Sequence, residues 1–126
     1  MKKIEIKDCA NYTYFRERLK DLNLLFEAIP IKTKNFCDLA VPVGGSRKGG
    51  YCYGDQKAVG ELKKYPSKFP NARLVDDKWV VWGIHDPKPC KSMEEQVTAG
   101  RFYGYHEKAI NEFTTRIYGK EITYAS

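Results

Sequence analysis

The sequence predicts an α+β fold, with a small, mostly antiparallel sheet, an N-terminal helix and a long C-terminal helical segment. Three observations carry this prediction. Apolar residues alternate with polar ones in short segments between residues 28 and 84, which is the period of strands. Two further segments, one near each end of the chain, have apolar residues at helical spacing. The 126 residues fit one domain, 1–126, and the 42% that are hydrophobic are enough to form a core.

The N-terminal part is expected to contain a strand, a helix and an extended segment. Ile4 and Ile6 alternate with charged residues, which predicts a short half-buried strand. Asn11 is a credible N-cap for a helix, and that helix would be buried along one stripe, formed by Phe15, Leu19, Leu22 and Phe26. Pro30 ends the helical pattern, and residues 28–32 and 35–43 are predicted to be extended.

The glycine-rich segment 44–50 is predicted to be a mobile hairpin connection between two strands, with Arg47 and Lys48 at its positively charged tip. The alternative is a lid over an anionic ligand, since backbone N–H groups in such loops bind anions. The segment does not match a P-loop, because Gly50 is followed by Tyr51, whereas that motif requires Lys and then Ser or Thr after its second glycine.

The following residues predict a helix and a β-hairpin. Asp55 can cap a short helix that runs through Lys64 and buries Ala58, Val59 and Leu62. Residues 72–75 and 78–84 are expected to pair as strands around a turn at Asp76-Asp77. The second of these strands is apolar on both faces, which favours a central position in the sheet or cover by a partner.

The C-terminal helical segment has an apolar stripe that changes sides. Ser92 to Glu95 form a capping-box pattern at its start, and Gly119 is expected to end it. Before Gly104 the small and apolar residues share one face, and after it they gather on roughly the opposite face. Either the helix breaks near Gly104, or one continuous helix packs against two bodies, which can include a second subunit. Ile122 and Tyr124 are expected to add an edge strand.

Gly100 and Gly104 are four residues apart, so on a continuous helix they would allow another backbone to approach closely. We therefore expect a helix crossing at a subunit interface, and hence a homo-oligomer. The alternative is that the two glycines only weaken the helix and mark a local kink.

Charge and cysteine content limit the class of partner. Lys and Arg outnumber Asp and Glu by 22 to 16, which gives a net charge of +6 and favours anionic partners over a purely solvated surface. No Cys-x-x-Cys motif occurs, and Cys52, His85 and Cys90 match no zinc signature, so we expect free thiols, no metal and no cofactor. Without a long apolar stretch or an apolar leader, we expect a cytoplasmic protein that does not enter the membrane.

The junction around Gly104 is the candidate binding site. It concentrates cationic and aromatic side chains, namely Arg101, Tyr103, Tyr105, His106 and Lys108. Guanidinium and ammonium groups suit phosphates, and aromatic rings stack on bases. Trp82 would supply a further ring if the helix lies on the sheet.

Catalytic residues are not evident. His106 and Glu107 are adjacent on the expected helix, so their side chains diverge and cannot act on one atom. We therefore expect a binding protein with no catalytic residues. The alternatives are a DNA- or RNA-binding module, or a small phosphodiesterase or nuclease that uses His106 and Glu107.

From residue 74 to 118, through Trp79-Val80-Val81-Trp82 and Gly100-Arg101-Phe102-Tyr103-Gly104-Tyr105, the chain resembles the phage anti-Thoeris family of nucleotide sponges. The resemblance implies a small α+β protein that assembles as dimers or hexamers in the host cytoplasm. It implies sequestration of cyclic ADP-ribose isomers made by bacterial TIR-domain defence enzymes, with cyclic di- or trinucleotides as further ligands. Arg101 would then bind a phosphate, Tyr103 or Trp82 would stack on adenine, and Arg47 and Lys48 would serve a second phosphate.

Overall fold

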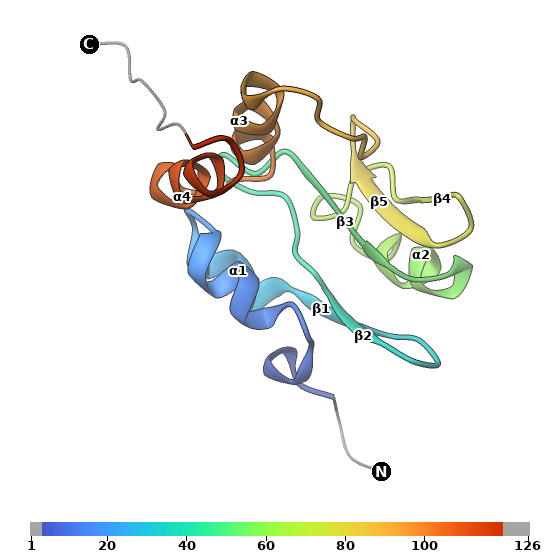
Figure 1. Ribbon diagram of the computed structural model, residues 1–126. Coiled ribbons are helices and arrows are strands. Elements are labelled where there is room, and N and C mark those ends of the chain that lie inside the picture. Colours follow the sequence, from blue (N-terminus) through green and yellow to red (C-terminus); the bar gives the residue numbers. More distant parts are fainter. Residues whose placement is uncertain (1–3, 120–126) are drawn as a thin grey trace.

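The computed structural model describes residues 4–119 and confirms the α+β class (Figure 1). Helices lie at both ends of the described chain, and the strands form two small antiparallel sheets. The elements, in chain order, are the 3₁₀ helix η1 (Ile6–Asp8), α1 (Tyr12–Arg18), the 3₁₀ helix η2 (Leu22–Glu27), β1 (Ile29–Lys32), β2 (Cys37–Ala40), β3 (Gly49–Tyr53), α2 (Gln56–Leu62), β4 (Arg73–Val75), β5 (Trp79–Gly83), α3 (Met93–Phe102) and α4 (Glu107–Tyr118).

The larger sheet has the order β3-β5-β4, with both neighbours antiparallel to β5. The prediction that this strand is central is confirmed, and so is the hairpin of β4 and β5. The turn residues of this hairpin, Asp76 and Asp77, have φ of 54° and 55°. Positive φ at both residues is typical of the mirror image of a type I turn, which suits the twist of a hairpin, although no glycine is present here. Helix α2 packs on this sheet, and Asp55 accepts a hydrogen bond from the Ala58 N–H at 3.0 Å as its N-cap.

The smaller sheet, β1 and β2, lies between two apolar cores. Ala40 packs with α2 and β5 in one core, whereas its neighbour Leu39 packs with α1 and η2 in the other. Adjacent residues of a strand point to opposite faces, so β2 serves both cores at once. The Trp82 ring completes the first core, where its Nε1–H donates to the Val41 carbonyl at 3.0 Å.

The N-terminal region differs from its prediction. The strand expected at Ile4 and Ile6 is wrong, because the chain there forms η1. Asn11 makes no side-chain cap on α1, because its amide group bonds instead to the backbone of Leu39, accepting from the N–H at 2.8 Å. The predicted helix also ends at Arg18, which changes the phase of its apolar stripe. Leu22 and Phe26 are consequently 47% and 83% exposed.

The segment 44–50 is not a hairpin connection. Gly44 and Arg47 exchange backbone hydrogen bonds of 3.0 and 2.9 Å, which close a tight turn. The chain then enters β3, whose strand partner is β5 rather than β2. The expectation of a positive tip is wrong for Arg47, which is only 2% exposed, while Lys48 is exposed.

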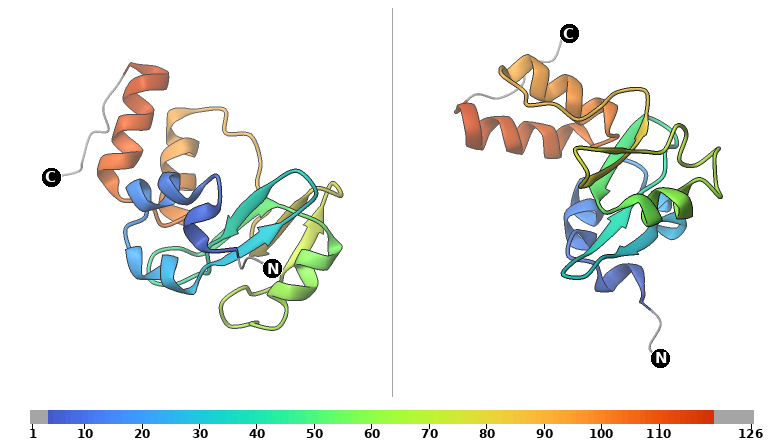
Figure 2. Two further views of the ribbon diagram at one scale, coloured as in Figure 1. Left: turned by 90° about the horizontal axis from the view of Figure 1, so that it is seen from below. Right: turned by 90° about the vertical axis from the view of Figure 1, so that its right-hand side faces the viewer.

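The C-terminal segment is two helices, α3 and α4, as one of the two alternatives predicted. Figure 2 shows them side by side at one end of the molecule. Ser92 caps α3, accepting from the Glu95 N–H at 3.1 Å, and Gly119 ends α4 in the left-handed conformation. The predicted edge strand at Ile122 and Tyr124 lies outside the described residues.

Contacts within one chain explain why the apolar stripe changes sides near Gly104. A Cβ at Gly100 would lie 2.8 Å from Ile110 Cγ1, so this glycine lets α3 and α4 cross closely. Gly104 has φ +78°, and a Cβ there would lie 2.5 Å from Arg47 Cβ and 2.9 Å from Arg47 Cα. Both close approaches are intramolecular, so the glycines do not require a subunit interface. The homo-oligomer stays a prediction.

No helix within residues 4–119 is both long and apolar enough to cross a bilayer.

Gly104→Ala should lower the free energy of unfolding by more than about 2 kcal/mol, because it strains a left-handed backbone and forces the methyl group against Arg47. Gly60→Ala is the matched control. It lies in α2 with nothing within 4 Å of the added methyl group, and should raise stability by up to about 1 kcal/mol. Denaturant unfolding of both variants measures the difference, and equal stabilities would contradict the packing described for the junction.

Candidate ligand-binding site

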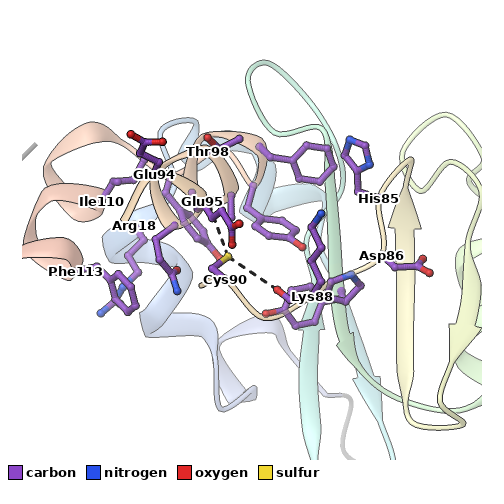
Figure 3. A pocket seen from close by; sticks show the side chains of 18 of the residues that line it. Arg18, His85, Asp86, Lys88, Cys90, Glu94, Glu95, Thr98, Ile110 and Phe113 are labelled. Atoms are coloured by element: carbon purple, nitrogen blue, oxygen red, sulfur yellow. Dashed lines mark hydrogen bonds between the residues drawn. The ribbon is translucent and has the colours of Figure 1, made fainter. Parts of the chain in front are cut away.

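A cavity of about 1200 Å³ lies between the helical pair α3–α4, helix α1 and the connector 84–92 (Figure 3). Figure 3 shows Arg18 and Phe113 on one side, and His85, Asp86 and Lys88 on the other. Typical pockets for small ligands measure roughly 300–1,000 Å³, so this cavity has room for a ligand of nucleotide size.

Tyrosine rings form one wall of the cavity. Tyr14 comes from α1, Tyr51 from β3, and Tyr103 and Tyr105 from the connection between α3 and α4. The rings of Tyr51 and Tyr103 contact edge to face at 5.5 Å between centroids, and those of Tyr14 and Tyr105 do so at 5.9 Å. Tyrosine combines an apolar face with a polar hydroxyl, so this wall can stack on a flat ring and also donate hydrogen bonds.

Backbone hydrogen bonds fix α1 against the junction between α3 and α4. The Lys20 N–H donates to the Gly104 carbonyl at 2.8 Å, and the His106 N–H donates to the Arg18 carbonyl at 2.9 Å. Tyr14 and Arg18 of α1 therefore reach the same cavity as Tyr105. The Arg18 guanidinium lies over the Tyr14 ring, with its Cζ 4.0 Å from the centroid, which is a cation–π contact.

Charges of both signs line the cavity. The cations are Arg18, Arg73 and Lys88, and the carboxylates are Asp86, Glu94 and Glu95. Arg73 is paired with Asp86 at 2.6 Å. The Glu95 carboxylate accepts from the Lys91 N–H, also at 2.6 Å. The lining thus balances its formal charge although the whole chain is basic, so the cavity does not provide the uniformly positive surface typical of nucleic-acid binding.

A smaller cavity of about 250 Å³ adjoins the tyrosine wall and shares all four of its tyrosines. Its other lining residues are Asn11, Phe15, Asp38, Arg47, Cys52 and Trp79. The four tyrosines therefore line both cavities.

Arg47 is a buried cation behind the tyrosine wall. Its Nη1 donates to the Tyr103 carbonyl at 2.8 Å, and its Nε donates to the Val41 carbonyl at 3.2 Å. Within residues 4–119 no carboxylate forms an ion pair with it. Burial lowers the pKa of Arg47, and the neighbouring tyrosines, foremost Tyr105, act in the opposite direction. The guanidinium thus acts as a structural link between the sheets and the tyrosine wall.

Burial raises the pKa values of Tyr51, Tyr103 and Tyr105 in this wall. The pKa of Tyr103 rises to about 12, and those of Tyr51 and Tyr105 also rise, in each case chiefly because burial disfavours the phenolate. At neutral pH the hydroxyls are therefore neutral and can donate to acceptors such as phosphate or carbonyl oxygens.

The residues predicted at the junction separate into two groups. Tyr103 and Tyr105 line both cavities. Arg101, His106 and Lys108 are not among the lining residues of either cavity. Arg101 pairs with Glu107 at 2.8 Å. His106 is the N-cap of α4, with Nδ1 accepting from the Ala109 N–H and Nε2 within 2.7 Å of the Glu17 carbonyl.

The roles expected for Trp82 and Arg47 in ligand binding are wrong, because both side chains are buried. Trp82 is fully buried, so its ring cannot stack on a ligand base. Arg47 is buried and already bonded to backbone carbonyls, so it is not an exposed phosphate ligand. Lys48 is exposed and donates to the Gly45 carbonyl at 3.1 Å, away from the lining of both cavities.

Sequence reasoning missed Tyr14, Arg18, Tyr51 and Arg73 as lining residues. Each lies on an element whose local pattern indicates only a solvated face or an edge, so no signal in the sequence brings them together. The set Cys52, His85 and Cys90 does not converge, and within residues 4–119 no group of three His, Cys, Asp or Glu side chains could hold a metal ion.

Fold and cavity together define a small α+β protein with an aromatic, ligand-sized hollow. The chain belongs to the DUF6302 family, which is described as a family of unknown function and matches residues 4–122. No curated protein and no solved structure gives a significant match.

Stability should fall at high pH, because Tyr51, Tyr103 and Tyr105 keep their protons to a higher pH in the folded protein than in the unfolded chain. For Tyr103 the contribution is complete below the ordinary pKa of 10.0 and is lost as the pH rises through about 12. Denaturant unfolding at a series of pH values measures this slope. Tyr103→Phe should reduce the slope, whereas Tyr65→Phe, at an exposed position, should leave it unchanged.

Proposed function

We propose that the protein binds a small nucleotide in the larger cavity and withholds it from other proteins. The nucleotide is not altered chemically while it is bound. The ligands we propose carry two or three phosphates, and cyclic ADP-ribose isomers and cyclic oligonucleotides are the class implied by the resemblance to phage anti-Thoeris proteins. Withholding such a signal would counter bacterial anti-phage defence. A dimeric or hexameric assembly is part of this proposal.

The observation that carries the proposal is the combination of rings and cations in one cavity. Tyr51 and Tyr103 offer ring surface to a base, while Arg18 and Lys88 lie in the same lining and suit phosphate oxygens. Glu94 offers a carboxylate acceptor, which suits the exocyclic amino group of a base. Ring, cation and acceptor are the three features that recognition of a nucleotide needs.

The balance of charge favours a small ligand over a nucleic acid. A polyanion would meet three carboxylates in this cavity as well as three cations, whereas a ligand with two or three phosphates can contact the cations alone. We propose a protein without catalytic activity, because both ring nitrogens of His106 already interact with backbone groups. The His85 ring lies 5.1 Å from that of Phe102, centroid to centroid.

Titration calorimetry against cyclic ADP-ribose isomers and cyclic di- and trinucleotides tests the proposal. Tyr51→Leu should weaken binding about tenfold or more, because stacking of a base on an aromatic ring is worth roughly 1–3 kcal/mol. Tyr65→Leu is the matched control: Tyr65 is 46% exposed, against 40% for Tyr51, and lines neither cavity. No heat with any ligand of the panel, in folded protein, would end the proposal.

Salt dependence separates the sponge from a nucleic-acid-binding module. The affinity for a ligand with two or three phosphates should fall much less as salt is raised, whereas a protein with roughly 6–10 phosphate contacts loses about 10³–10⁵-fold between about 50 and 200 mM. Binding of an oligonucleotide with this steep dependence, without binding of the panel, would favour the alternative. Recovery of intact ligand after heat denaturation distinguishes the sponge from a phosphodiesterase.

A further inference from the structure

Away from the larger cavity, two cysteines that are distant in sequence face each other. Cys9 follows η1 and Cys37 is the first residue of β2, and their Sγ atoms lie 2.9 Å apart. The Ala10 N–H donates to the Cys37 carbonyl at 3.1 Å, so the two backbone segments are also held side by side. Both thiols are free.

The other two cysteines have no such partner within residues 4–119. Cys52 is buried in the core that contains Trp82, and Cys90 lies beside the Lys88 and Glu95 carbonyls at the larger cavity. Only Cys9 and Cys37 among the four cysteines therefore meet in the folded state.

We propose that Cys9 and Cys37 form a site of reversible disulfide formation, with a low-molecular-weight disulfide such as oxidised glutathione as the oxidant. Cys37 is half-buried and Cys9 is 4% exposed, so Cys37 is the thiol that meets the oxidant. The Cys37 thiolate attacks one sulfur of oxidised glutathione and releases one glutathione thiolate. Cys9 then loses its proton and attacks the Cys37 sulfur, which releases the second glutathione. Two protein thiols are oxidised and one glutathione disulfide is reduced to two thiols.

The environment of Cys9 makes the second step the slow one. Burial is the main cause that raises the pKa of Cys9 to about 12, and the hydrogen bond with Cys37 and the charges of Asp38 and Asp8 raise it further. A thiol with this pKa is seldom ionised near neutrality, so it attacks only a sulfur held directly beside it. The mixed disulfide on Cys37 places its sulfur at that position.

The cross-link would hold the segment just before the N-terminus of α1 against the first residue of β2. The loop that it closes, residues 9–37, contains α1, η2 and β1 and most of the residues of one of the two apolar cores. Closing a loop of this length restricts the unfolded chain, so the oxidised protein should melt roughly 10 °C higher than the reduced protein. This inference does not depend on the proposed nucleotide.

The test incubates the folded protein in glutathione buffers of increasing oxidised fraction, blocks the remaining thiols by alkylation and measures the intact mass and the peptide map. We expect a product lighter by two hydrogen atoms, with a Cys9–Cys37 peptide that reductant separates and a raised melting temperature. Cys9→Ala should stop at a stable glutathione adduct on Cys37, and the Cys52→Ala, Cys90→Ala double variant should still form the Cys9–Cys37 cross-link.

Two results would overturn the inference. One is a stable glutathione adduct on Cys37 of the wild-type protein that never closes. The other is a protein that keeps four alkylatable cysteines, or links Cys52 or Cys90 instead, in the most oxidising buffer.

Discussion

The structure depends on one buried cation. Arg47 donates to the Val41 carbonyl at the end of the smaller sheet and to the Tyr103 carbonyl at the end of α3. Gly104 packs directly against its backbone, and the Lys48 N–H donates to the Phe102 carbonyl at 2.7 Å. A buried guanidinium without a carboxylate partner is costly unless every donor is satisfied, and no buried side-chain nitrogen or oxygen within residues 4–119 lacks a hydrogen-bond partner. The junction between α3 and α4 is therefore held where the tyrosines can line a cavity.

The candidate site follows from this arrangement. Tyr103 and Tyr105 belong to the junction that Arg47 holds, and α1 brings Tyr14 to the same place through its backbone bonds to the junction. The positive charge of the sequence does not accumulate in the cavity, because Arg47 is used internally and Arg73 is paired with Asp86. Recognition there would come from rings and a few directed polar groups rather than from a strong field.

Features determined within a few residues were predictable from the sequence. Asp55 and Ser92 cap helices as expected, because an N-cap needs only a side-chain oxygen and the N–H two or three residues later. Features that depend on distant partners were not. Asn11 bonds to β2 instead of capping its own helix, and Arg47 is buried although its glycine-rich surroundings indicate an exposed loop. The larger cavity combines segments from α1 to α4, so no local pattern reveals it.

The position of β2 between two cores affects how the protein unfolds. Leu39 supports one core and Ala40 the other, and both are fully buried. Neither core can unfold while the other keeps its packing, because the loss of either core releases β2, the four-residue strand that both cores share. Two sheets and two cores thus amount to a single cooperative unit, and heat or denaturant should disrupt them in one transition.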